Sequence, residues 1–290
     1  MRRLAALALA ALLTVAGCTS APTAPDSGPD ATADTATAPA GRPLALVYRG
    51  PAACDGCPEA ARALLERGGL AVRYIGPHER LHFAAATLAG AAVYVQPGGT
   101  NGQEVTTAWD LLRRDPAFRP ELVRDYVRGG GRYLGLCMGG YLAGDPGFDL
   151  LPGDSGQYVH AEGASVTDER DQLVDVTWRG HRQRMYFQDG PYFDLDPTPN
   201  APETGTETGT GAAPGSVDVL ARYLPDNHPA AVVAPYGTGR VAVSGPHPEA
   251  PPDWYRDYHL SDESPTGLAL GDDLVRTLLA PAPSPPSPPS

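Results

Sequence analysis

The sequence predicts an α/β fold in which a mostly parallel central sheet lies between layers of helices, followed by a β-rich hairpin region. Between residues 43 and 137, short apolar runs alternate with helical patterns, which is typical of parallel strands joined by helices. After residue 137, apolar runs are separated by short turns, which predicts hairpins. With 290 residues, 42% of them hydrophobic, the chain is long enough for one large domain.

Each expected element rests on a local pattern. Apolar runs predict strands at residues 44–48, 71–75 and 91–95, and a fourth strand that runs into Cys137. Because the carboxyl ends of parallel strands share one edge of a sheet, the loops that follow these strands are expected to meet there. Helices are expected at residues 58–67, 105–113, 121–128 and 268–279, and later strands at residues 173–178, 184–187, 217–223, 230–235 and 240–244.

Residues 135–140, Gly-Leu-Cys-Met-Gly-Gly, lie between a predicted strand and a predicted helix. This pattern is typical of a nucleophile elbow, in which small neighbours allow a sharp turn that presents one reactive side chain. Cys137 is therefore the candidate nucleophile, and the N-terminus of the following helix would favour its thiolate. The alternative is a buried structural cysteine in a glycine-rich turn, because Cys is among the residue types most often buried.

A second strand runs into Gly-Pro-His-Pro-Glu at residues 245–249. His247 could take the proton of a thiol, and Glu249 could fix the tautomer of the imidazole, as in a catalytic triad. A histidine between two prolines can also be a plain loop residue. The hypothesis of catalysis therefore depends on the presence of Cys137 elsewhere in the chain.

Together, Gly-x-Cys-x-Gly at residues 135–139 and His-Pro-Glu at residues 247–249 resemble the class I glutamine amidotransferase superfamily. Within it, Val-Tyr-Arg-Gly-Pro at residues 47–51 and Pro-Gly-Gly at residues 97–99 resemble the biotin-protein-ligase N-terminal domain family. The resemblance covers about residues 43 to 280. It implies a flavodoxin-like three-layer sandwich with a Cys-His-Glu site at one edge of its sheet.

The Pro-Gly-Gly loop follows the third predicted strand directly. An N–H group of Gly98 or Gly99, together with that of Met138, could form an oxyanion hole, and the superfamily resemblance implies the same role. As an isolated motif, Pro-Gly-Gly is more often only a turn.

Tyr141 and the loop at residues 188–193 are expected to face a substrate, with Gln188 and Asp189 as its polar groups. The alternative for this loop is an ordinary surface loop. Tyr141 stands where glutamine-hydrolysing members carry Gln, so glutaminase activity is not expected. Biotin transfer is not expected either, because the resemblance does not extend to a ligase catalytic domain.

Cys54 and Cys57 form a Cys-x-x-Cys pair between the first strand and the first helix. Three interpretations stay open: a local disulfide, a redox-active pair, and free or metal-bound thiols. The first is favoured because nearby thiols outside the cytoplasmic membrane tend to oxidise. No second Cys/His pair at metal spacing is present in the sequence, so neither a metal nor another cofactor is expected.

The first residues predict export. Residues 1–17 have a charged start, an apolar stretch and small residues before Cys18, as in a bacterial lipoprotein signal peptide, with a plain secretory signal as the alternative. Cys18 would carry the lipid, and residues 18–42 would be a disordered tether on the outer face of the cytoplasmic membrane. A flexible insert is expected near residues 197–216, and residues 281–290 form a Pro-rich tail.

Charge and composition restrict the partners. The formal net charge is −12 and all 22 basic residues are Arg. An acidic chain without basic runs gives no phosphate-binding surface, so nucleic-acid binding is not expected. Two function hypotheses follow: a Cys-His-Glu hydrolase or amidase acting through a thioester on a small amide, ester or peptide, and a non-catalytic ligand-binding module of the cell envelope.

Overall fold

The computed structural model describes residues 41–100, 102–196, 216–260 and 267–281. The predicted signal peptide, Cys18 and almost all of the predicted tether lie outside these ranges. The same holds for residues 197–215 of the predicted insert and for residues 282–290 of the tail.

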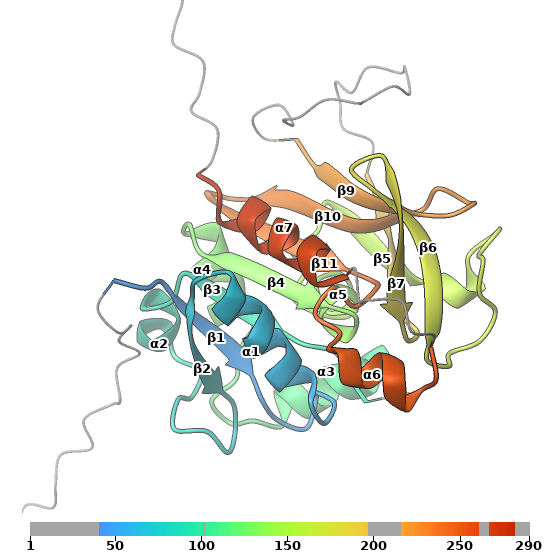
Figure 1. Ribbon diagram of the computed structural model, residues 1–290. Helices are drawn as coiled ribbons and strands as arrows, with labels where there is room; N and C mark the ends of the chain where they lie inside the picture. Colours follow the sequence, from blue (N-terminus) through green and yellow to red (C-terminus); the bar gives the residue numbers. More distant parts are fainter. Residues whose placement is uncertain (1–40, 101, 197–215, 261–266, 282–290) are drawn as a thin grey trace, which may run out of the picture. The chain divides into compact units, whose positions relative to one another are not determined.

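Nine strands of the described chain form one mixed sheet (Figure 1). Its first five strands in space pair in parallel, and each of the remaining four pairs antiparallel to its neighbour. In spatial order they are β2 (Ala71–Ile75), β1 (Leu44–Tyr48), β3 (Val93–Gln96), β4 (Arg132–Leu136), β11 (Gly239–Ser244), β10 (Pro229–Tyr236), β9 (Asp218–Tyr223), β6 (Gln172–Trp178) and β7 (His181–Phe187).

The predicted flavodoxin-like sandwich with a mostly parallel sheet is wrong, because half of the strand pairings in this sheet are antiparallel. The hairpins were predicted, but not their place in the main sheet. β11 lies parallel to β4, and its other edge pairs with β10, so the sheet continues through both hairpins to β7. An unpaired edge exposes backbone N–H and C=O groups, which the added strands satisfy.

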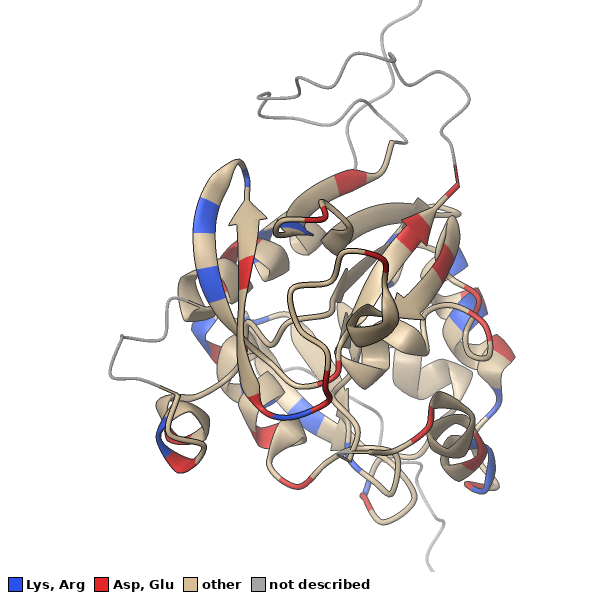
Figure 2. Ribbon diagram, turned by 90° about the vertical axis from the view of Figure 1, so that its right-hand side faces the viewer, with Lys and Arg blue, Asp and Glu red and all other residues tan. Residues whose placement is uncertain are grey.

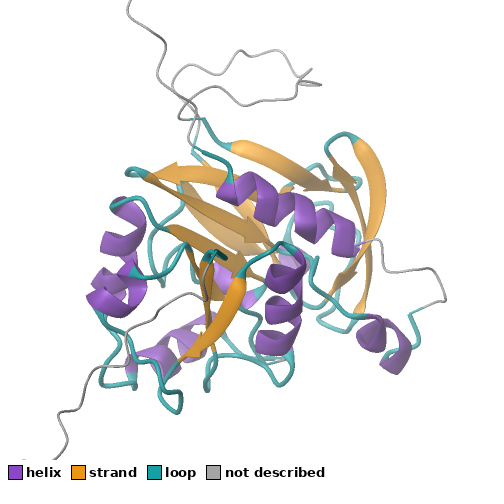
Figure 3. Cartoon of the chain, turned by 60° about the vertical axis from the view of Figure 1, so that its left-hand side comes forward, coloured by secondary structure: helices purple, strands orange, loops and turns teal. Residues whose placement is uncertain are grey.

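Helices cover both faces of the parallel half of the sheet (Figure 3). On one face, α1 (Cys57–Arg67) and α7 (Gly267–Leu279) pack through Leu64 and Leu274 against strand residues such as Val95. The opposite face is covered by α2 (Ala85–Ala89), α3 (Val105–Arg113), α4 (Pro120–Arg128) and the short α5 (Met138–Tyr141). The helices at residues 105–113, 121–128 and 268–279 were predicted from their apolar periodicity.

A two-stranded antiparallel ribbon joins β5 (Gly153–Gln157) to β8 (Pro191–Leu195). The sequence predicts no strand at β5, and at the start of β8 it predicts a loop. Both strands are short and lack a regular alternation of apolar and polar residues, so the period-2 signal is weak. Gln157 is the last residue of β5, and β8 begins two residues after Asp189. The ribbon therefore brings both side chains to the pocket at Cys137.

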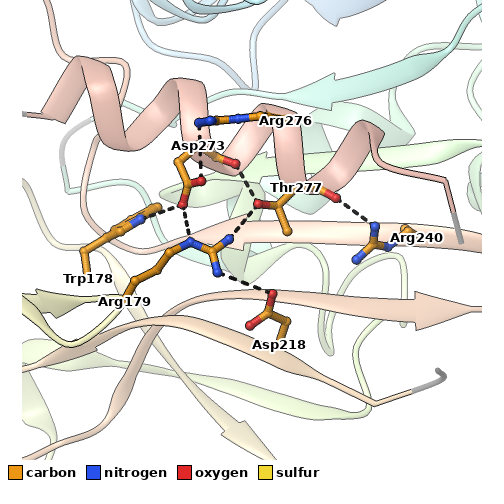
Figure 4. Close-up of polar contacts among 7 residues, drawn as sticks. All are labelled: Trp178, Arg179, Asp218, Arg240, Asp273, Arg276 and Thr277. Carbon is orange, nitrogen blue, oxygen red and sulfur yellow. Dashed lines mark hydrogen bonds and ion pairs between the residues drawn. The ribbon is translucent and has the colours of Figure 1, made fainter. Parts of the chain in front are cut away.

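The antiparallel half is tied to α7 by polar contacts (Figure 4). Asp273 of α7 accepts hydrogen bonds from Trp178 Nε1 at 2.9 Å and from Arg179 Nε at 2.7 Å. Arg179 also donates to Thr277 Oγ1 at 2.8 Å. The turn after β6 is thereby held against the helix that covers β4 and β11.

The outer hairpin of the sheet carries charges of both signs (Figure 2). Arg182 and Arg184 of β7 pair across the hairpin with Asp175 of β6. Such charges reduce the tendency of an edge strand to pair with another chain. Among the described residues, no helix has the length and apolar character needed to cross a membrane.

Candidate active site

Cys137 lies at the junction of β4 and α5 with φ 50° and ψ −108°. A non-glycine residue in this region of backbone space is strained, and such strain is typical of nucleophile elbows. The Cys137 N–H donates to the carbonyl of Ser244 at the end of β11, at 2.8 Å. This bond links the elbow to the strand that leads to His247.

The glycines of the elbow allow its sharp turn. A Cβ on Gly139 would overlap the carbonyl oxygen of Gln96, and a Cβ on Gly135 would overlap the carbonyl oxygen of Gly139. The chain can therefore pass from β4 into α5 at this point only with hydrogen in place of a side chain. The spacing Gly-x-Cys-x-Gly follows from this close approach of backbone to backbone.

His247 and Glu249 follow β11 and form a buried pair. His247 Nδ1 and Glu249 Oε1 lie 2.9 Å apart, and the two residues are 3% and 2% exposed. The imidazole packs against Tyr186 and Trp254, with ring centroids 5.6 and 5.4 Å away, and these two aromatic rings also contact each other. Its orientation is thus fixed by one hydrogen bond and two edge contacts.

Two opposing effects act on the pKa of His247. Burial alone would lower this pKa, but the Glu249 carboxylate and the Cys137 sulfur together raise it well above its usual range. The Nε2 atom of His247 is buried and has no well-formed hydrogen bond with a described residue. The arrangement favours an imidazolium beside the Cys137 sulfur.

Gly98 lies next to both His247 and Cys137. A Cβ on Gly98 would lie 3.3 Å from Cε1 of His247 and 3.8 Å from Cβ of Cys137. A Cβ on Gly99 would lie 2.9 Å from Cγ of Met138. The three residues predicted to form an oxyanion hole, Gly98, Gly99 and Met138, therefore lie together beside Cys137.

Cys54 and Cys57 form a disulfide that packs against the same loop. The Cys54 N–H donates to the Gly98 carbonyl at 2.9 Å, and Cys57 Sγ would lie 3.0 Å from a Cβ on Gly98. The disulfide therefore contacts the predicted oxyanion loop at Gly98, and no local sequence pattern predicts this contact.

A small, partly open pocket lies at Cys137. The Cys137 thiol donates a hydrogen bond to the Gln188 carbonyl, with 3.5 Å between sulfur and oxygen. The Tyr141 hydroxyl donates to the Asp189 carbonyl at 3.2 Å. The three residues predicted to face substrate, Tyr141, Gln188 and Asp189, line this pocket together with Gly99 and Met138.

The sequence analysis missed several pocket residues. Gln103 and Glu104 could have been included because they follow the Pro-Gly-Gly loop closely. Gln157 and Glu169 had no sequence signal, since they reach the pocket through the β5–β8 ribbon and the segment before β6. Within the described ranges, no group of three or more His, Cys, Asp or Glu residues could hold a metal ion.

Comparison with known proteins gives no family. No family model and no curated protein matches the chain. Among solved structures, it is similar to the cytoplasmic protein STM1381 from Salmonella typhimurium LT2, with 15% identity, a TM-score of 0.46, and coverage of 81% of this chain and 98% of that one.

Glycosidases are also among the similar structures. The exo-β-1,4-mannosidase Op5Man5 from Opitutaceae bacterium strain TAV5 has 11% identity and a TM-score of 0.45, over 82% of this chain and 36% of that one. The β-galactosidase from Rahnella sp. R3 has 16% identity and a TM-score of 0.42, over 80% of this chain and 31% of that one. The chain thus spans about a third of each glycosidase.

Proposed function

We propose that the chain is a cysteine hydrolase or amidase of the cell envelope, similar in its site to class I glutamine amidotransferases. The observation that carries this proposal is the strained position of Cys137 beside a buried His247–Glu249 pair. A structural cysteine needs neither the unusual backbone angles nor an oriented imidazole. The three groups together meet the requirements of nucleophile, acid–base group and orienting acid.

In the proposed reaction, the Cys137 sulfur forms a bond to the substrate carbonyl carbon. The N–H groups of Gly98, Gly99 and Met138 stabilise the negative charge that develops on the carbonyl oxygen. His247 gives its proton to the departing amine or alcohol as the C–N or C–O bond breaks, leaving a thioester on Cys137. His247 then takes a proton from water, which attacks the thioester and releases a carboxylic acid and the cysteine.

An electrophilic probe tests this proposal. Wild-type protein should react at Cys137 much faster than free cysteine does, and His247→Ala should slow the reaction by about 10²-fold or more, the usual contribution of general acid–base catalysis. Phe187→Leu, a substitution in the core of β7, serves as the control for general effects of altered packing. Equal labelling of wild type and His247→Ala would contradict an activated nucleophile.

A ligand-binding module is the second candidate, and one contact favours it. The Cys137 thiol lies toward the Gln188 carbonyl rather than in a well-formed hydrogen bond with His247. If the chain only binds, a ligand from an amide library should bind equally well to wild type and to Cys137→Ala, and neither protein should release product. Turnover by the wild type that Cys137→Ala lacks would exclude this candidate.

The proposed location is the outer face of the cytoplasmic membrane, with a lipid on Cys18. The basis is the sequence pattern of residues 1–18. Mass spectrometry of detergent-extracted protein should find a diacylglyceryl group on Cys18 at the mature N-terminus. Unmodified protein released into the medium, with a different N-terminus, would refute lipid anchoring.

A further inference from the structure

We infer that the substrate of this site carries a cationic group rich in N–H donors, an ammonium or a guanidinium, close to the bond that is cleaved. The inference rests on the proposed function, because it assigns the substrate class of the same pocket. Its basis is the set of charges and hydrogen-bond acceptors that surround Cys137.

Three carboxylates line the pocket, those of Glu104, Glu169 and Asp189. They take part in none of the ion pairs between described residues. Arg170 directly follows Glu169 in the sequence, but its guanidinium pairs with the Asp168 carboxylate at 2.7 Å and not with Glu169. None of the described pocket residues is Arg, Lys or His.

Two of these carboxylates are held close to each other. The amide Nε2 of Gln157 donates to Asp189 Oδ1 at 2.8 Å and to Glu169 Oε1 at 3.3 Å. One amide group thus contacts two carboxylates of like charge. The two carboxylates repel each other, and a cation between or beside them would offset this repulsion. Asp189 directly follows Gln188, whose carbonyl faces the Cys137 sulfur.

The local environment of Asp189 disfavours its ionised form. Burial, together with repulsion from Glu169 and Glu104, raises the pKa of Asp189 to about 6, although the hydrogen bond from Gln157 and the charge of His160 act in the opposite direction. A cationic ligand would stabilise the ionised carboxylate and relieve this repulsion.

An independent observation concerns Gln103, which also lines the pocket. Its Oε1 atom is buried and accepts no hydrogen bond from a described residue. An unsatisfied buried acceptor is costly, and a turn of the Gln103 side chain toward the pocket would let an N–H donor on a ligand satisfy it. Acceptors and negative charge at one pocket fit an ammonium or guanidinium better than a neutral or anionic group.

The test compares two thiol reagents of opposite charge on the full chain. The reagents are 2-aminoethyl methanethiosulfonate, a cation, and 2-sulfonatoethyl methanethiosulfonate, an anion. Labelling rates are followed by mass spectrometry of the peptide that contains Cys137. After division by the same rate ratio for free cysteine, the cation should react about tenfold faster or more, and added salt should reduce this preference.

Variants locate the charges responsible. Asp189→Asn with Glu169→Gln should bring the ratio close to that of free cysteine. The control is Asp125→Asn, which removes one exposed carboxylate from α4. Because α4 comes before the start of β4 and Cys137 follows the end of β4, this substitution should leave the ratio unchanged. A wild-type ratio equal to that of free cysteine, or one that salt does not change, would overturn the inference.

The same experiment separates this inference from the proposed function. A cation preference that depends on Asp189 and Glu169, in a protein that hydrolyses nothing, would keep the ligand class and reject the hydrolase. Hydrolysis of neutral amides at rates equal to those of cationic amides, with no charge preference in labelling, would keep the hydrolase and reject the ligand class.

Discussion

Cys137 shows how a single residue can depend on its neighbours for its chemistry. Its positive φ is possible because Gly135 and Gly139 let three stretches of backbone approach closely. Its partner His247 receives its orientation from Glu249, a residue two positions along the same segment. At the scale of residues, the site is therefore defined by local motifs that meet at one sheet edge.

The pair His247–Glu249 should make stability depend on pH. The pKa of His247 in the folded chain is raised above the ~6.5 of an unfolded histidine. The stabilisation from Glu249 is therefore fully present below that value and is lost as pH rises through the raised pKa of His247. Glu249→Gln should lower the free energy of unfolding by about 2 kcal/mol near pH 6, as expected for a hydrogen bond to a charged group.

Urea unfolding of wild type and of Glu249→Gln, from about pH 6 up through the raised pKa of His247, measures the difference in their free energies of unfolding. The gap between wild type and Glu249→Gln should shrink toward high pH. Asp253→Asn, which alters an exposed pair with Arg256, should have almost no effect. A gap of the same size at all pH values would show that Glu249 stabilises the fold without acting on the charge of His247.

At the scale of elements, the disulfide segment and the Pro-Gly-Gly loop form one unit. The turn at the start of α1 contacts Gly98 through the Cys54 N–H and the Cys57 sulfur. Gly98 also lies next to His247 and Cys137. The turn that leads into α1 thus supports the loop that would form the oxyanion hole.

Replacing both cysteines by alanine should loosen this loop. In Cys54→Ala/Cys57→Ala, amide hydrogen exchange at position 54 and at Gln103, whose N–H groups donate to the carbonyls of Gly98 and Thr100, should accelerate about tenfold, because the covalent support of Gly98 is lost. Exchange in α4, which packs on the opposite face of the sheet from α1, should stay the same and serves as the internal control. Unchanged exchange at position 54 and at Gln103 would mean that the loop is held by its other contacts.

At the scale of the whole described domain, one sheet combines a parallel half and an antiparallel half. The elbow and His247 lie at the ends of β4 and β11, the two parallel strands nearest the boundary between the halves. The pocket wall from Gln157 to Asp189 comes from segments after the elbow. The candidate site is therefore built where the two halves join.

The contacts of Asp273 should stabilise this junction. Asp273→Ala removes the acceptor for Trp178 and Arg179, and should lower the free energy of unfolding by about 1–3 kcal/mol. Arg276→Ala removes a more exposed partner of the same carboxylate and should cost less than about 0.5 kcal/mol. Urea unfolding measures the free energy of unfolding of each variant. If Asp273→Ala lowers it by no more than Arg276→Ala does, the link between α7 and the turn after β6 contributes little.

The sequence by itself determined most of the elements and the three candidate catalytic residues. Helix and strand periodicity, the glycines around Cys137 and the motif His-Pro-Glu are local features, readable wherever the segment lies in the fold. β1, β2 and α3 were predicted at their observed bounds for this reason. The missed elements, α2, α6 (Pro252–Asp257) and the strands of the β5–β8 ribbon, are short and have weak periodicity.

Tertiary structure decided the rest. The order and direction of strands depend on pairing between segments far apart in the chain, so hairpin signals could not show that β6, β7, β9 and β10 extend the main sheet. The same holds for the disulfide behind Gly98 and for the carboxylates Glu169 and Asp189 beside Cys137. Their charges and contacts acquire a role only through neighbours that folding brings together, because electrostatic and packing energies depend on distance in space rather than in sequence.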